Sequence, residues 1–196
     1  LVPSLFHAKK SGVIQEASVA PVHQNAGIGR ALLQEAVARI KRLDVAEQFF
    51  AQALQSNPND SLAWLLKGTL HAFRDEGKEA VRHTRQAQKL SPLDPLKYYF
   101  DSLAATAALS AGQYPRALHL AERSYRLNRT HASTMRALIT ALWNLQRETE
   151  ARTVASELLR LDPAFRVGTY LERSPATPYT LGRTVATALQ GAGIPT

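Results

Sequence analysis

The repeat unit of this chain is clearest in residues 61–92, which read SLAWLLKGTLHAFRDEGKEAVRHTRQAQKLSP. Four leucines, at positions 62, 65, 66 and 70, recur at steps of three and four residues. This spacing places them on one face of a helix, so we expect a helix over Ser61–Arg74. Gly77 interrupts the pattern, and a second helix is expected over Glu79–Leu90. The stretch therefore predicts two helices joined by a short turn.

The same unit recurs along the chain. Ala80 follows Ala46 by 34 residues, Ala117 follows Ala80 by 37, and Ala151 follows Ala117 by 34. Paired helices with a period near 34 residues are typical of stacked repeats. We therefore expect helices beginning near Asp44 and covering 96–110, 114–127, 132–145, 149–161 and 165–171, then a last helix that Thr177 and Pro178 cap and Gly191 ends.

Residues at fixed places in each unit resemble those of tetratricopeptide repeats. Trp64, Leu65 and Gly68 match the aromatic, leucine and glycine positions of a first helix. The later units match at the turn and at the small residues of the second helix, through Gly112-Gln113-Tyr114, Ala117, Ala121, Ala151, Ala155 and Pro163. Lys67, Thr84 and Ala105 depart from the pattern.

This resemblance covers residues 44–163 and implies an all-α, helix-pair solenoid of about four pairs. We expect three parts: a partial strand-turn-helix segment or disordered segment (1–42), the repeats (43–163) and C-terminal capping helices (164–196). Residues 93–175 resemble more particularly the repeat arrays attached to bacterial nucleotide cyclases and winged-helix regulators. The resemblance implies a non-catalytic scaffold that binds protein segments or relays a signal in a bacterial cytoplasmic assembly.

Residues 1–42 do not follow the repeat pattern. Residues 12–21 read as a strand, 24–30 as a glycine-bearing turn and 31–40 as a helix. Free N–H groups at the start of a helix form a site for phosphate. The turn resembles the acetyl-coenzyme A motif of GNAT acetyltransferases. That resemblance implies a cofactor site formed by Val19, Ala20, Gln24, Asn25, Ala26, Gly27, Ile28, Gly29 and Arg30.

Two interpretations of this segment compete. A GNAT domain needs strands on both sides of the motif, and the strands that should follow are missing, so we expect a remnant without acetyl transfer. An acetyl-coenzyme A-binding acetyltransferase fragment fused to the repeats is the alternative function. Gly27 also lies 34 residues before Ser61, so the helix can instead fill the first slot of a first repeat. Because Leu1 is not methionine, we expect the chain to be part of a longer product or a processed form.

Composition excludes several kinds of site. The net charge is +8, but the basic residues alternate with acidic ones, which favours a solvated surface over a nucleic-acid site. Cysteine is absent and the six histidines lack metal-ligand spacing, so we expect no metal. The longest apolar stretch, Leu103–Leu109, is far shorter than the roughly 20 residues that span a bilayer. We therefore expect no membrane contact and a cytoplasmic location.

The surface for a partner is expected on the first helix of each pair, which lines the concave side of such a solenoid. The side chains there are a mixture of apolar and hydrogen-bonding types, which suggests an extended peptide or an intramolecular helix as the bound segment. The candidates are Leu65, Thr69, Phe73, Tyr99, Ser102, Thr106, Arg136, Thr140 and Asn144. No cofactor is expected, except acetyl-coenzyme A under the alternative, and the oligomeric state is left open.

Overall fold

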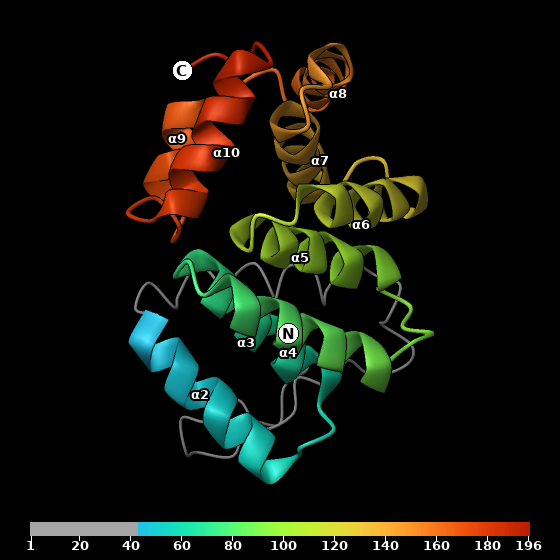
Figure 1. The fold of residues 1–196 in the computed structure, drawn as a ribbon, viewed down its shortest axis with the longest axis vertical. Coiled ribbons are helices and arrows are strands. Elements are labelled where there is room, and N and C mark those ends of the chain that lie inside the picture. Colours follow the sequence, from blue (N-terminus) through green and yellow to red (C-terminus); the bar gives the residue numbers. More distant parts are fainter. Residues whose placement is uncertain (1–42) are drawn as a thin grey trace, which may run out of the picture. The chain divides into compact units, whose positions relative to one another are not determined.

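The computed structural model describes residues 43–196 (Figure 1). The chain divides into two compact units, Leu1–Pro58 and Asn59–Thr196. In the first unit the described helix is α2, Leu43–Ser56. The second unit contains α3 (Ser61–Phe73), α4 (Gly77–Leu90), α5 (Lys97–Ser110), α6 (Tyr114–Leu127), α7 (Ala132–Asn144), α8 (Glu148–Leu161), α9 (Val167–Arg173) and α10 (Thr180–Gly191).

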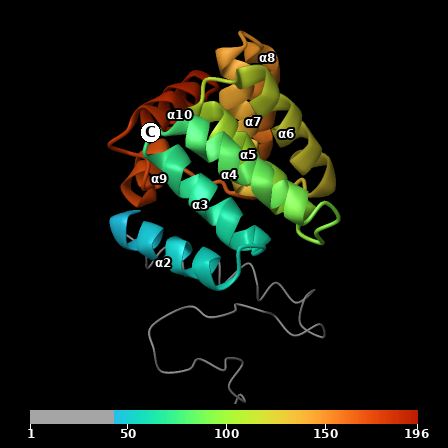
Figure 2. The ribbon, with the colours of Figure 1, turned by 60° about the horizontal axis from the view of Figure 1, so that its bottom comes forward.

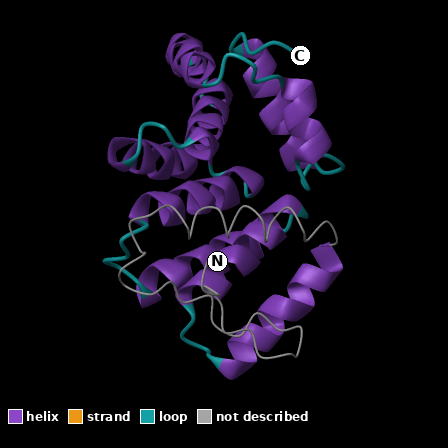
Figure 3. Cartoon of the chain, turned by 180° about the vertical axis from the view of Figure 1, so that it is seen from behind, coloured by secondary structure: helices purple, strands orange, loops and turns teal. Residues whose placement is uncertain are grey.

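The all-α fold class is confirmed, because all regular elements within residues 43–196 are helices (Figure 3). The strand and helix predicted over 12–40 lie outside the described residues. Two details of the prediction are wrong. The second helix, predicted over Glu79–Leu90 after a break at Gly77, already begins at Gly77. The short helix expected over 165–171 starts two residues later, because the Phe165 N–H donates to the Asp162 carbonyl in a turn (3.1 Å).

The helices of the second unit pack as a solenoid of pairs. Each helix from α3 to α8 contacts the next one along the chain, and the first helices also contact one another, α3 with α5 and α5 with α7 (Figure 2). The second helices α4, α6 and α8 therefore form the other layer. This is the arrangement expected of repeats whose apolar faces are buried only when neighbours stack.

The recurring alanines lie where two helices touch. Ala80, Ala117 and Ala151 have no exposed surface. A Cβ at Gly68 would lie 2.7 Å from Thr84 Cγ2 and 3.0 Å from the Ala80 carbonyl oxygen, so only glycine allows α3 and α4 to approach this closely. Thr84 departs from the apolar pattern without leaving a buried hydroxyl unpaired, because Oγ1 donates to the Ala80 carbonyl (2.9 Å).

Candidate functional site

We call the surface built by α3, α5 and α7 the first-helix face. All nine candidate side chains belong to these three helices: Leu65, Thr69 and Phe73 to α3, Tyr99, Ser102 and Thr106 to α5, and Arg136, Thr140 and Asn144 to α7. Four of them, Leu65, Thr69, Ser102 and Thr140, are buried, and the other five are half-buried. The face is therefore already largely covered.

The threonines of this face do not offer a free donor. Thr69 Oγ1 donates to the Leu65 carbonyl (3.0 Å), Thr106 to Ser102 (3.2 Å) and Thr140 to Arg136 (2.7 Å). In each case the acceptor lies four residues earlier in the same helix. The three threonine hydroxyls of the first-helix face are thus already paired within their own helices.

Tyr99 belongs to the core more than to an open groove. Its ring packs against a small cluster that includes Leu65, Phe100 and Leu103. Burial, followed by the neighbouring Tyr98, raises the pKa of Tyr99 to about 12. Substitution of Tyr99 would therefore disturb packing as well as any contact with a partner.

The C-terminal segment covers part of the first-helix face. Helix α10 makes its most extensive contacts with α7 and further contacts with α3 and α5 (Figure 1). Leu181, Val185 and Leu189, spaced four residues apart, are buried. The candidate residue Arg136 lies beneath this segment too, with its guanidinium carbon 4.9 Å from the centre of the Tyr170 ring. Burial lowers the pKa of Arg136, and Tyr170 partly opposes that change.

Helix α10 is held at its N-terminus by a residue 105 positions away in sequence. Asp75 accepts the N–H groups of Thr180 (2.6 Å) and Leu181 (3.0 Å). Burial tends to raise the pKa of Asp75, but these backbone hydrogen bonds outweigh it and hold the pKa below its usual value. The expected cap Thr177 is wrong, because its hydroxyl donates to the Leu171 and Ser174 carbonyls instead (2.5 and 2.9 Å).

The sequence contained a partial signal for Asp75. Asp75, Gly112 and Gln146 occupy the turn within successive helix pairs, and all three have positive φ, 62°, 68° and 61°. Glycine adopts this conformation freely, whereas aspartate and glutamine are strained there. An aspartate at a glycine position is thus a candidate functional residue, although the repeat spacing alone does not reveal that it caps α10.

The other end of α10 is fixed by Trp143. A Cβ at Gly191 would lie 2.2 Å from Cζ2 of the Trp143 ring, so any side chain at this position would collide with it. Arg152 lies over the ring as well, with its guanidinium carbon 5.8 Å from the ring centre. Beyond α10, the Val167 N–H donates to the Pro195 carbonyl (2.9 Å) and Ile194 is buried. The chain therefore remains attached to the array almost to its C-terminus.

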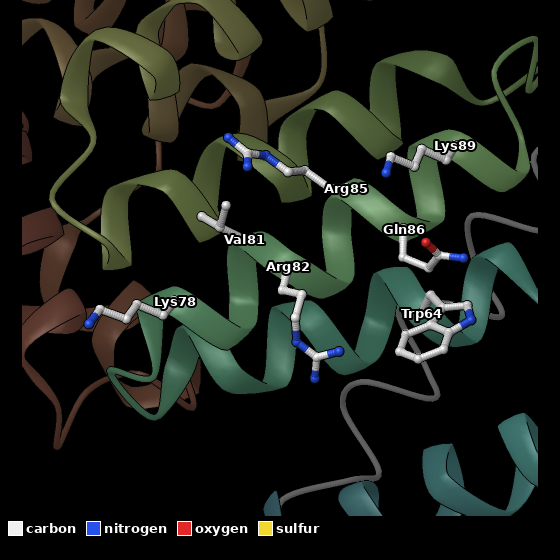
Figure 4. A pocket seen from close by; sticks show the side chains of 7 residues that line it. All are labelled: Trp64, Lys78, Val81, Arg82, Arg85, Gln86 and Lys89. Atoms are coloured by element: carbon white, nitrogen blue, oxygen red, sulfur yellow. The ribbon is translucent and has the colours of Figure 1, made fainter.

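A second surface feature is a basic pocket formed by α4 and Trp64 of α3 (Figure 4). Its lining residues are Trp64, Lys78, Val81, Arg82, Arg85, Gln86 and Lys89. Arg82 is paired with Glu79 through its Nε (2.9 Å). Four basic residues of α4, Lys78, Arg82, Arg85 and Lys89, thus line one pocket, where they would attract an acidic group in a salt-dependent manner.

A buried histidine pair lies between α3 and α4. The His71 and His83 rings are 4.8 Å apart, and Trp64 stacks on His83 at 5.2 Å. The Arg82 guanidinium lies 2.9 Å from His83 Nε2. Because a guanidinium only donates, this contact requires an unprotonated Nε2. Burial, then the charges of Arg82, His71 and Lys67, lower the pKa of His83 to about 4, against a smaller opposing effect of Glu79.

The lowered pKa of His83 predicts that the folded protein is less stable in acid. The pKa is about 6.5 in the unfolded chain and about 4 in the folded one, so the unfolded state takes up the proton first. Stability is complete above pH 6.5 and is lost as the pH falls towards 4, by up to about 3 kcal/mol. Urea unfolding between pH 7.5 and 4 measures this slope. His83→Gln should reduce the dependence of the unfolding free energy on pH, whereas substitution of the exposed His119 should not. If both variants showed the same pH dependence, His83 would not be the group responsible.

The part of the chain that the structure describes contains neither a membrane-spanning helix nor a metal-binding cluster. No helix in residues 43–196 has the length and apolar character that crossing a membrane requires. Within the same residues, no group of three potential metal-binding side chains comes together. The acetyl-coenzyme A motif, from Val19 to Arg30, lies outside the described residues, so a cofactor site there stays a prediction.

Comparison with known proteins supports the fold. No protein-family model and no curated protein matches the sequence. A MamA structure from Desulfovibrio magneticus RS-1 is similar with a TM-score of 0.55 and 16% identity, covering 83% of this chain and 92% of that one. YrrB, described as a TPR protein with an unusual peptide-binding site, is similar with a TM-score of 0.53 and 18% identity, covering 87% and 88%. At these identities the likeness concerns architecture, and the described part of the chain has the fold of a tetratricopeptide-repeat solenoid.

Proposed function

We propose that this protein is a non-catalytic interaction scaffold and that its first-helix face binds a helical segment of a partner protein. One observation carries the proposal. The face holds an amphipathic helix, α10, through the buried side chains of Leu181, Val185 and Leu189. A surface that accepts one such helix has the shape and the apolar character to accept another.

The mode of recognition follows from this geometry. Three anchors at steps of four residues are typical of an amphipathic helix lying in an apolar groove. The hydroxyls of Thr69, Thr106 and Thr140 are used within their own helices, so packing outweighs hydrogen bonding on this face. A peptide ligand also agrees with the similarity to YrrB, a TPR protein with an unusual peptide-binding site. We place the assembly in the bacterial cytoplasm, since a chain without cysteine suits a reducing compartment.

The binding face is tested with peptides selected from a displayed library against the full chain. Asn144→Lys, on α7, is expected to weaken a selected helical peptide at least tenfold, because it places a charge on the apolar face. Thr153→Lys, exposed on the second helix α8, is the matched control. Asn144 and Thr153 each donate to the carbonyl four residues earlier, at 2.8 and 3.0 Å.

Isothermal titration calorimetry provides the affinities. Equal weakening by both lysines would place binding elsewhere or reflect charge alone. An effect of Thr153→Lys without an effect of Asn144→Lys would move the binding surface to the second helices. Either result would overturn the assignment of the first-helix face.

A further inference from the structure

The contacts of α10 divide into three groups that differ in chemistry. Asp75 caps its N-terminus, its middle buries an apolar stripe, and Gly191 lies against Trp143 near its end. None of these contacts depends on α10 being covalently joined to the array. A separate helix with the same pattern would make the same contacts.

The N-terminal contact is suited to release. Asp75 and Thr180 are exposed, and the hydrogen bond from the Leu181 N–H to Asp75 is part-buried. When α10 leaves, water can solvate both the carboxylate and the N–H groups. Breaking this cap therefore leaves no buried polar group unpaired, in contrast to the loss of a buried ion pair.

The apolar stripe of α10 and Gly191 define which helices the first-helix face can bind. The buried positions of α10 are 181, 182, 185, 188 and 189, which read Leu, Gly, Val, Ala and Leu, and Gly191 follows. A competing helix needs apolar side chains at the first, fifth and ninth positions of this pattern. It also needs glycine at the eleventh position, where Trp143 leaves no space for a Cβ.

We propose that α10 is an internal ligand that keeps the α7 side of the first-helix face closed, and that the partner is a helix of this pattern which displaces it. The inference rests on the proposed function. A tethered helix acts at an effective concentration in the millimolar range, so a free helix of equal intrinsic affinity competes poorly. The apparent dissociation constant of the partner equals the intrinsic one divided by the fraction of chains in which the face is open.

The experiment uses the full chain and a fluorescein-labelled synthetic peptide of residues 174–196. Gly191→Ala in the chain weakens the internal helix, because its Cβ would collide with Trp143, but it leaves the face unchanged for the added peptide. Val185→Ala is a second variant that acts on the internal helix alone and needs no movement of Trp143. Gly168→Ala is the matched control, since the nearest atom to a Cβ there is 3.9 Å away.

Fluorescence anisotropy should show that Gly191→Ala and Val185→Ala bind the peptide at least tenfold more tightly than the unaltered chain and Gly168→Ala. A peptide that itself carries Gly191→Ala should bind at least tenfold more weakly to both variants. Far-UV circular dichroism confirms that each variant is folded.

Three outcomes would overturn the proposal, and they can be told apart. Equal affinities for the unaltered chain and both variants would mean that the face binds helices without being closed by α10, so the proposed function would stand. No binding by any folded variant would remove the helix-binding function as well. Dimers detected by light scattering in the unaltered chain, with peptide-dependent dissociation, would mean that α10 serves a second copy and not its own array.

Discussion

Replacing Gly77 by alanine is expected to lower the free energy of unfolding by about 3 kcal/mol, at the upper end of the usual cost of overpacking. Gly77 is the first residue of α4 and is buried against the end of α5. A Cβ there would lie 2.5 Å from Ala111 Cα, 2.6 Å from Ala111 N and 2.7 Å from the Ser110 carbonyl oxygen. All three atoms belong to the backbone, so no side-chain rotation can relieve the collision and two helix pairs must move apart.

Chemical denaturation followed by circular dichroism measures this loss. Gly168→Ala is the control, because it is the same substitution at an exposed helical position with open space around the Cβ. Alanine is favoured over glycine within a helix, so Gly168→Ala should leave stability unchanged or raise it by up to about 1 kcal/mol. Similar midpoints for the two variants would mean that the α3–α4 turn and the end of α5 do not approach this closely.

The repeat architecture could be predicted because its signals are local. The apolar steps of three and four residues fix which face of each helix is buried, and the alanine spacing fixes where helices touch. Ala80, Ala117 and Ala151 indeed have no exposed surface. The three extra residues of the 37-residue interval lie between the equivalent turn residues Asp75 and Gly112.

The position of α10 could not be predicted in the same way. Its stripe of Leu181, Val185 and Leu189 shows which face is apolar, but not which helices cover that face. The sequence favoured a local cap, Thr177, because such residues commonly precede helices. The structure uses Asp75 instead, a tertiary contact that no local pattern contains. The sequence therefore predicts the helix itself, but not that it lies over part of the first-helix face.

The gathering of basic residues on α4 is likewise not evident from the sequence. In the sequence, Lys78, Arg82, Arg85 and Lys89 are separated from one another by two or three other residues, so they read as dispersed. A helix brings residues three and four apart onto one face, and these four line a single pocket together with Trp64. A linear count of like charges underestimates such clusters wherever the chain is helical.

Replacing Arg123 by methionine is expected to lower the free energy of unfolding by about 3 kcal/mol. The Asp101 side chain has no exposed surface, and Arg123 contacts both of its carboxylate oxygens, with Nε 2.6 Å from Oδ2. Asp101 raises the pKa of Arg123 by hydrogen bonding, as expected for a strong pair. Methionine keeps most of the apolar stem but removes the charge. Within the described residues, the buried carboxylate then keeps a side-chain hydrogen bond from the Gln88 amide, 2.9 Å away.

The loss of stability depends on whether the charge left without its partner is buried or exposed. Two further variants test this dependence. In Asp101→Asn the unpaired group is Arg123, whose side chain is 38% exposed and can be solvated, so this variant should be less destabilised than Arg123→Met. Arg147→Met removes an arginine from an exposed pair with Glu150 and should change stability little. Urea unfolding ranks the three. If Arg123→Met and Arg147→Met were equivalent, the Asp101 carboxylate would have to reach water, and the α5–α6 interface would be looser than the packing of Asp101 indicates.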